Sequence, residues 1–276
     1  MKKLPRVLIK IGGAALVAED ALDYVAEAVQ QFRLNGHQVI VVHGGGPAIN
    51  AELTRLGITW RFLNGQRVTT PEMMGVIEST LCGQVNSKLV RHFVASGIPA
   101  VGLSGADAKT LLCKPASEEL GRVGAIQQVN SIWIEELLRV STRPVPVIAP
   151  IGVGLDGQPY NVNADYAASR LAGALQVDQL IYLTDQNGVL DKQGRPYNSL
   201  SEPQIRALID DGVVTGGMMT KMNAVLSALK SGVGGVRVMN GRDASFACNS
   251  FEFGTTCRLG ARLKPADMEL NAYAAV

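Results

Sequence analysis

Residues 39–46 read VIVVHGGG, a short run of β-branched residues that ends in a histidine and three consecutive glycines. Residues 7–13, VLIKIGG, have the same arrangement with two glycines. Continuous apolar runs of this length are typical of strands that are covered on both faces, and glycine lets the chain turn sharply where such a strand ends. The two stretches therefore predict strands of a largely parallel sheet, each followed by a glycine turn.

The same alternation continues along the chain. Compact apolar runs bounded by Gly, Pro or Asp predict strands, and runs with apolar residues three and four apart predict helices between them. Strands are expected at 7–11, 39–42, 100–103, 145–149, 179–184 and 235–239, and helices at 22–32, 70–92, 130–140, 164–175, 202–211 and 218–230. The pattern predicts an α/β fold, a three-layer α/β/α sandwich with a mainly parallel central sheet.

A hairpin and a two-lobed organisation are also expected. Asn64-Gly65 lies between the short runs 60–63 and 66–69, and this dipeptide is the strongest local signal for a β-hairpin. No flexible linker is evident, because the glycine-rich residues 150–157 look like a turn at the end of a strand. We expect two lobes, residues 1–175 and 176–276, that share one continuous sheet.

Composition excludes several classes of protein. The 276 residues are 47% apolar and 18% charged, which suffices for a buried core and argues against disorder, collagen and coiled coil. A net charge of +2 is too small for the basic surface that nucleic acid or an anionic membrane attracts. No apolar run approaches the roughly 18 residues of a membrane helix. The four cysteines form no C-x-x-C pair and are expected to be reduced thiols in a cytoplasmic protein.

Glycine turns after the strands indicate an anion site. They lie at 12–13, 44–46 and 102–105, and the carboxyl ends of parallel strands are where open α/β sheets bind ligands. Backbone amides at glycine can approach anionic oxygens closely. One such turn is more often a plain connection, but three on one edge favour a site. None of them matches the P-loop or the dinucleotide fingerprint.

Charged and polar residues near these turns are the candidates for chemistry. Lys10 interrupts an apolar strand, so it either extends to solvent or neutralises a phosphoryl group. Lys221 lies near the start of a predicted helix, where the helix dipole disfavours a cation unless an anion binds. The sequence NVNAD at 161–165 holds more capping residues than one helix start uses. Residues 183–191 are suited to a nucleotide-binding loop or to a plain turn.

Taken together, these segments resemble the acetylglutamate kinase branch of the amino acid kinase family over residues 5–242. KIGG at 10–13 and the region 185–189 are shared across the wider family, and imply phosphoryl transfer without specifying a substrate. Narrower motifs favour the acetylglutamate branch. They are VHGGGP at 42–47, NGQRVT at 64–69 and NVNAD at 161–165.

The resemblance implies ATP-dependent phosphorylation of the side-chain carboxylate of N-acetyl-L-glutamate, in arginine biosynthesis, with Mg²⁺ carried on the ATP phosphates and no protein-bound metal. The catalytic residues it implies are Lys10, Lys221, Asp165 and Gly13, with Asp165 holding the lysines and not acting as a base. The substrate-binding residues that the resemblance implies are Gly45, Gly46, Arg67 and Asn161. The nucleotide-binding residues that it implies are Asp185, Gly188, Val189, Leu190, Val213 and Thr215. The first lobe would bind the amino acid and dimerise, and the second would bind the nucleotide.

The sequence leaves two alternative functions open, and it also predicts an oligomeric state. A related kinase could act on another carboxylate, such as a carrier-linked aminoadipate, and a catalytically silent protein of this fold could sense a metabolite. Arginine-inhibited hexameric members of the family resemble one another in having an N-terminal helix before the first strand. The nine residues before Lys10 are too few to form such a helix. Residues 251–256 also depart from the family pattern. We therefore expect a homodimer that is insensitive to arginine, and assign no function to residues 258–276.

Overall fold

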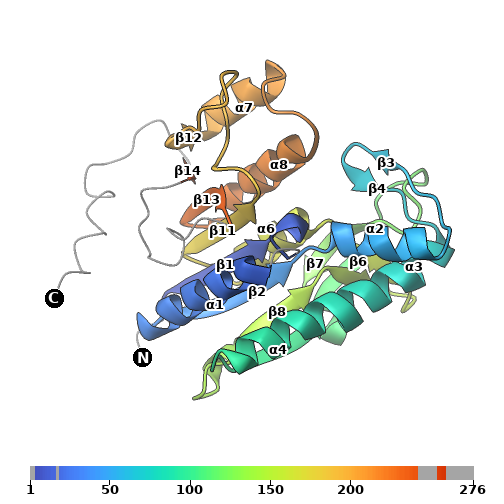
Figure 1. Cartoon of the computed structure of the whole chain (residues 1–276), viewed down its shortest axis with the longest axis horizontal. Helices are drawn as coiled ribbons and strands as arrows, with labels where there is room; N and C mark the ends of the chain where they lie inside the picture. Colours follow the sequence, from blue (N-terminus) through green and yellow to red (C-terminus); the bar gives the residue numbers. More distant parts are fainter. Residues whose placement is uncertain (1–3, 17–18, 242–253, 259–276) are drawn as a thin grey trace.

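The computed structural model describes residues 4–16, 19–241 and 254–258 (Figure 1). The main sheet has eight strands: β1 (Arg6–Ile11), β2 (Gln38–His43), β5 (Ala100–Ser104), β8 (Val145–Ala149), β11 (Gln179–Thr184), β12 (Ser199–Ser201), β13 (Gly235–Asn240) and β14 (Thr255–Arg258). Their order is β12-β14-β13-β11-β1-β2-β8-β5. Of these pairings only β13 with β14 is antiparallel. The six predicted strands are confirmed, with bounds that differ by at most one residue at either end.

Helices cover both faces of this sheet, as the fold class requires. They are α1 (Glu19–Leu34), α2 (Gly46–Arg55), α3 (Pro71–Glu78), α4 (Ser87–Ala95), α5 (Ile132–Arg139), α6 (Ala164–Ala174), α7 (Glu202–Asp210) and α8 (Gly216–Lys230). Alternate residues of β1 serve the two faces: Ile9 packs in a core with α1 and α4, and Leu8 packs in a core with α5, α6 and α8. This period of two is the geometry of a strand buried on both sides.

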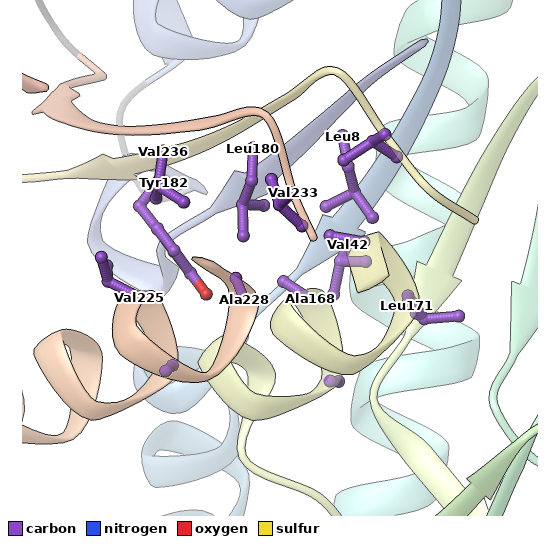
Figure 2. Close-up of a cluster of buried hydrophobic side chains, with 14 of the residues drawn as sticks. Leu8, Val42, Ala168, Leu171, Leu180, Tyr182, Val225, Ala228, Val233 and Val236 are labelled. Atoms are coloured by element: carbon purple, nitrogen blue, oxygen red, sulfur yellow. The ribbon is translucent and has the colours of Figure 1, made fainter. Parts of the chain in front are cut away.

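The core under α6 and α8 extends towards the carboxyl ends of the strands of the main sheet. Figure 2 shows Leu180 and Tyr182 of β11 above Ala168 of α6 and Ala228 of α8. The small alanines let both helices lie close to the sheet. Tyr182 carries its hydroxyl group down between the helices, where it donates a hydrogen bond of 3.0 Å to the backbone oxygen of Asp165. The packed core thereby fixes the start of α6.

Smaller sheets complete the fold. The predicted hairpin is confirmed as β3 (Phe62–Leu63) and β4 (Gln66–Arg67), with Asn64 and Gly65 at φ values of 50° and 75°. Positive φ at both central residues is what a tight two-residue hairpin turn requires. Four further strands form a second sheet in the order β10-β9-β6-β7 that we did not predict: β6 (Leu111–Pro115), β7 (Gly124–Val129), β9 (Ile151–Val153) and β10 (Pro159–Asn161).

The predicted helix at 70–92 differs from expectation in its middle. Thr70 caps α3 as predicted, since its Oγ1 accepts a hydrogen bond of 3.2 Å from the Met73 amide. Residues Ser79–Asn86 then form a π-helical segment before α4 begins. The apolar periodicity cannot reveal this wider turn, because a π segment adds one residue per turn without changing residue types. Helix α2, which opens with Gly46-Pro47, was also not predicted.

The two halves of the chain meet in the middle of the main sheet. Strands from the first 175 residues occupy one side and strands after residue 178 occupy the other, so β1 and β11 are neighbours. Their register sets Lys10 beside Tyr182. Strand β14 is the described part of the divergent C-terminal segment, and residues 242–253 and 259–276 lie outside the described residues. None of the helices described is long and apolar enough to cross a membrane.

Candidate active site

A cavity of about 350 Å³ lies at the carboxyl ends of β1 and β2. Its wall is built from the two glycine turns after these strands, the β3–β4 hairpin and the segment that leads into α6. Seven of the residues predicted for the site line this one cavity: Lys10, Gly13, Gly45, Gly46, Arg67, Asn161 and Asp165. Residues spread over more than 150 positions of sequence are thus brought to one edge of the sheet, as the strand-end argument predicts.

Two lysines and one aspartate form a buried cluster, of which Lys10 and Asp165 line the cavity, while Lys221 does not line it and reaches the cluster through Asp165. Lys10 Nζ lies 2.8 Å from Asp165 Oδ1, and Lys221 Nζ lies 3.1 Å from Asp165 Oδ2. All three residues are buried. They come from β1, α6 and α8, so the cluster joins the two halves of the chain. Two ammonium groups against one carboxylate leave a net charge of +1, which an anionic group would neutralise.

The titration of the cluster follows from its burial and charges. Burial disfavours the charged carboxylate of Asp165, but the ammonium groups of Lys10 and Lys221 outweigh it and lower the pKa of Asp165 to about 2. Burial and the like charge of Lys10 lower the pKa of Lys221, against the attraction of Asp165. Asp165 is therefore ionised and occupied by lysines at neutral pH, which suits a positioning group and not a base.

Glycine is required at the turn after β1. A Cβ on Gly13 would lie 2.7 Å from Cδ of Pro47 and 3.0 Å from the amide nitrogen of Gly46. The turn after β2 is held by the Gly44 amide, which donates a hydrogen bond of 2.8 Å to the Ile11 carbonyl. Among the described residues, the amides of Gly45 and Gly46 have no protein acceptor. These two donors lie at the start of α2, where the helix dipole favours an anion.

Arg67 is a second, separate cation on the cavity wall. Its guanidinium carbon lies 4.8 Å from the ring centre of Phe62 and 5.5 Å from that of Trp60, and Nη2 donates to Asn50 Oδ1. The other terminal nitrogen, Nη1, is buried and has no hydrogen-bond partner within the part of the chain that is described. Burial also lowers the pKa of Arg67. A carboxylate in the cavity would satisfy both the free donor and the charge.

The three polar residues before α6 have three different tasks. Asn163 caps the helix, because its Oδ1 accepts hydrogen bonds from the amides of Asp165 (2.9 Å) and Tyr166 (3.3 Å). Asp165 forms ion pairs with Lys10 and Lys221. Asn161 Nδ2 donates a hydrogen bond of 3.0 Å to Thr69 Oγ1, which links the end of β10 to the chain just after the hairpin. Only one of the three is used as a cap, as the surplus of capping residues predicts.

The residues predicted for nucleotide binding lie elsewhere. They surround the loop after β11 and the start of α8, and none of them lines the cavity: Asp185, Gly188, Val189, Leu190, Val213 and Thr215. Gly188 has a φ of 140°, and a Cβ there would lie 2.6 Å from Thr255 Oγ1. The Val189 amide donates to the same oxygen at 2.9 Å. Thr215 precedes α8 without a side-chain hydrogen bond to it.

Some residues of the site were not predicted, and one predicted turn lies outside it. Phe62 faces Arg67 in the hairpin register, a pairing that the two-residue turn already dictates, so the sequence could have revealed it. Asn50 gave no signal, because it lies in an unpredicted helix. The glycine turn at 102–105 does not line the cavity: Gly102 lies within β5, and a Cβ on Gly105 would meet the Ile151 carbonyl oxygen at 2.6 Å.

Metal and disulfide chemistry can be addressed for the described residues only. Among them, no group of three or more His, Cys, Asp or Glu side chains could hold a metal ion. The described cysteines, Cys82, Cys113 and Cys257, are free thiols, and burial raises the pKa of each. The fourth, Cys248, lies outside the described residues.

Known proteins resemble this chain over most of its length. Curated relatives named acetylglutamate kinase include one from Koribacter versatilis, 42% identical over 256 residues that cover 91% of this chain and 97% of the relative. Another, from Ruegeria pomeroyi, is 41% identical over 236 residues, covering 86% of this chain and 82% of the relative. The crystal structure of smu.665 from Streptococcus mutans superimposes with a TM-score of 0.81 at 29% identity, covering 92% of this chain and 98% of that one.

The model of the amino acid kinase family matches residues 5–240. This span contains all the motifs that carry the resemblance and every residue of the cavity. It includes both glycine turns, the hairpin and all three members of the lysine–aspartate cluster. On the extent of this match and the identity to its relatives, the chain belongs to the amino acid kinase family.

Proposed function

We propose that this protein transfers the γ-phosphoryl group of ATP to the side-chain carboxylate of N-acetyl-L-glutamate, giving ADP and N-acetylglutamyl 5-phosphate, a step of arginine biosynthesis. The observation that carries the proposal is the presence of two separate cationic sites at one cavity, the Lys10–Asp165–Lys221 cluster and Arg67. A substrate with two carboxylates needs such a pair. The curated relatives, all named acetylglutamate kinase, support the same substrate.

The proposed chemistry needs no general base. A carboxylate is ionised at neutral pH, so its oxygen attacks the γ-phosphorus directly while the bond to the oxygen that bridges the β- and γ-phosphates breaks. Negative charge then spreads over the transferring group. Lys10 and Lys221 would stabilise that charge, and Asp165 would hold both ammonium groups in place. Amides of Gly13, Gly45 and Gly46 would face the reacting oxygens.

Arg67 would bind the α-carboxylate of the substrate, with Asn161 beside it. The free donor at Nη1 and the two aromatic rings beside the guanidinium support this assignment. It also accounts for a preference for the acetylated amino acid. A free α-ammonium group is attached to the same carbon as that carboxylate, and would place a second positive charge beside a buried guanidinium.

The nucleotide would bind to the second lobe, residues 176–276, at Asp185, Gly188, Val189, Leu190, Val213 and Thr215. The start of α8 supports this, because its capping residue makes no side-chain bond and leaves amides for phosphate oxygens. Mg²⁺ would arrive on the ATP phosphates, since it prefers phosphate oxygen and water as ligands. The first lobe, residues 1–175, would bind the amino acid.

We further propose a cytoplasmic homodimer formed through the first lobe. Strand β5 is the edge of the main sheet, and α4 packs beside it with Val94 57% exposed. An open strand edge with apolar side chains nearby is a suitable surface for a second copy. Light scattering should give the mass of two chains, and a monomer or hexamer would contradict this assembly.

The catalytic proposal is tested by ADP release with a panel of acylated and free amino acids. We expect turnover with N-acetylglutamate that depends on ATP and Mg²⁺, and poor turnover with glutamate. Equal turnover of the two would refute the substrate assignment. Turnover only with a carrier-linked aminoadipate would identify a related kinase, and binding of N-acetylglutamate without ADP release would identify a sensor.

A further inference from the structure

His43 is a fully buried histidine at the end of β2, immediately before the glycine turn at 44–46. Its Nδ1 lies 2.8 Å from the carbonyl oxygen of Gly44, and its Nε2 lies 3.1 Å from Nδ2 of Asn86. Asn86 is also buried, and is the last residue of the π-helical segment. The substrate chemistry proposed above uses neither side chain, so their arrangement calls for a separate explanation.

The partners of Asn86 determine where the imidazole proton lies. Asn86 Nδ2 also lies 2.9 Å from the carbonyl oxygen of Val147 and, at a longer 3.4 Å, from that of Leu103, and both oxygens are only acceptors. The nitrogen of the side-chain amide therefore faces both Val147 and His43, and Nε2 of the imidazole must accept. The proton is then on Nδ1 and is donated to the Gly44 carbonyl. Burial keeps the ring neutral, because it lowers the pKa of His43 to about 4.

That hydrogen bond orients the first amide of the glycine cradle. The Gly44 carbonyl and the Gly45 amide belong to one peptide group, and in a planar trans peptide they point in opposite directions. Holding the carbonyl against His43 therefore turns the Gly45 N–H away from the histidine. Gly45 lines the cavity, and its amide has no acceptor in the described part of the chain. The orientation of this donor is thus set by His43.

The π-helical segment packs against the same glycine turn. A Cβ on Gly45 would lie 2.5 Å from Cδ2 of Leu81, so the turn rests directly on this segment. Gly102 of β5 leaves room for the side chain of Asn86, since a Cβ there would lie 2.3 Å from Asn86 Oδ1. The wider π turn thus presents Leu81 to the glycine turn and Asn86 to His43. π-Helical turns are often found at functional sites.

We propose that Asn86 and His43 are positioning residues for phosphoryl transfer. Asn86 fixes the Nδ1–H tautomer of His43, and His43 holds the Gly44–Gly45 peptide so that the Gly45 amide faces the reacting oxygens. The role of the amide rests on the proposed function, whereas the tautomer is a property of the protein alone. Neither side chain touches substrate.

The tautomer can be tested without any turnover. The chain has three histidines, so the protein labelled with ¹⁵N-histidine gives three imidazole spectra, and His43→Asn identifies the one that belongs to residue 43. We expect a protonated Nδ1 and an unprotonated Nε2 at pH 7. In Asn86→Asp the carboxylate would accept a hydrogen bond from Nε2, so an Nε2–H signal that is absent from the wild type should appear. A wild-type spectrum with Nε2–H, or with both nitrogens protonated, would overturn the proposal.

The effect on phosphoryl transfer is tested with paired variants. His43→Leu removes the donor, and we expect kcat to fall on the order of tenfold or more, which is less than the ~10² for losing an oriented amide outright because the amide itself remains. His43→Asn keeps an N–H near the position of Nδ1 and should recover most of that loss. Gly102→Ala displaces the Asn86 side chain, and Asn86→Asp replaces its N–H donor with an acceptor. We expect kcat to fall in both variants. KM for ATP should change by less than about threefold in all four variants.

Controls separate positioning from folding and from charge. Asn35→Asp makes the same change of charge at an exposed site in the turn after α1 and should keep wild-type kcat. Far-UV circular dichroism and thermal melting show whether each variant is folded at the assay temperature. Equal kcat for folded His43→Leu and His43→Asn would refute the positioning role. If the wild type phosphorylates no carboxylate, the proposed function fails, while the imidazole spectrum still decides the tautomer.

Discussion

Individual cations at the cavity should differ in which kinetic constant they control. Lys10→Ala and Lys221→Ala each remove a charge that interacts with the transferring group, so kcat should fall by ~10² or more. Arg67→Ala removes an interaction with the unreacting end of the substrate and should mainly raise KM for N-acetylglutamate. Steady-state assays with each variant measure both constants.

A lysine elsewhere on the same helix provides the control for this series. Lys230 is exposed near the end of α8, where its Nζ lies 3.6 Å from Glu202, and Lys230→Ala should leave both constants unchanged. If Lys10→Ala kept kcat within a few-fold of wild type, Lys10 would be only a structural partner of Asp165. In Lys10→Ala, Asp165 still has Lys221 as its partner, so a folded variant is expected.

The residues that could be predicted from sequence are those whose type conflicts with their local setting. Lys10 is a charge in an apolar strand, which leaves extension to solvent or a ligand as its alternatives, and Lys221 is a cation near a helix start, a conflict that a bound anion would remove. His43 and Asn86 show no such conflict, because a histidine at a strand end and an asparagine in a helix are ordinary. Their roles depend on a contact between positions 43 residues apart, which composition and period do not encode.

Among the elements, the hairpin is expected to couple the amino-acid site to α8. Gly65 at its tip has a φ of 75°, and a Cβ there would lie 2.7 Å from Thr220 Oγ1. Thr220 precedes Lys221 on α8. In Gly65→Ala either the hairpin tip or the Thr220 side chain must shift, so KM for N-acetylglutamate should rise several-fold, on the scale of about 1 kcal/mol. Initial rates over a range of substrate concentrations measure this.

The chain contains a matched control for Gly65. Gly57 has a similar φ of 71° but no atom within 4 Å of a built Cβ, so Gly57→Ala reports backbone strain without the contact. The double variant Gly65→Ala/Thr220→Ala removes the threonine hydroxyl and should restore part of the lost affinity, a non-additive result. Additive effects, or an equal loss in Gly57→Ala, would show that the contact with α8 is irrelevant.

Elements with a strong period were predictable, and those that depend on tertiary contacts were not. Strands β1, β2 and β8 of the main sheet are buried at every residue, so their apolar runs are continuous and clear. Strand β6 contains Lys114 and Pro115, and β9 has only three residues, so neither resembles an isolated strand. They form because they pair with one another. The π-helical segment likewise packs against the glycine turn, a tertiary contact that its own residue types do not reveal.

For the whole molecule, the buried histidine predicts a dependence of stability on pH. The pKa of His43 is lowered from 6.5 to about 4 in the folded state, so between these values the unfolded chain binds more protons. The free energy of unfolding should therefore fall as pH is lowered from about 6.5 to 4, by on the order of 3 kcal/mol from this residue. Urea unfolding at several pH values measures it.

Two variants isolate this contribution. In His43→Asn the group is absent, so the loss of stability over that pH range should be smaller than in wild type. His92→Gln removes a part-exposed histidine of α4 and should leave most of the dependence in place. A wild-type slope that persists in His43→Asn would mean that His43 is protonated in the native protein.

The central position of β1 has a consequence for synthesis of the chain. Residues 6–11 are synthesised long before β11, which must pair along one side of them and ends at residue 184. Until then a nascent first half can join β1 to β2 and leave the other edge of an apolar strand open. Exposed edges of this kind recruit other chains. During translation, the edge of β1 that later pairs with β11 is thus a place where other chains can bind.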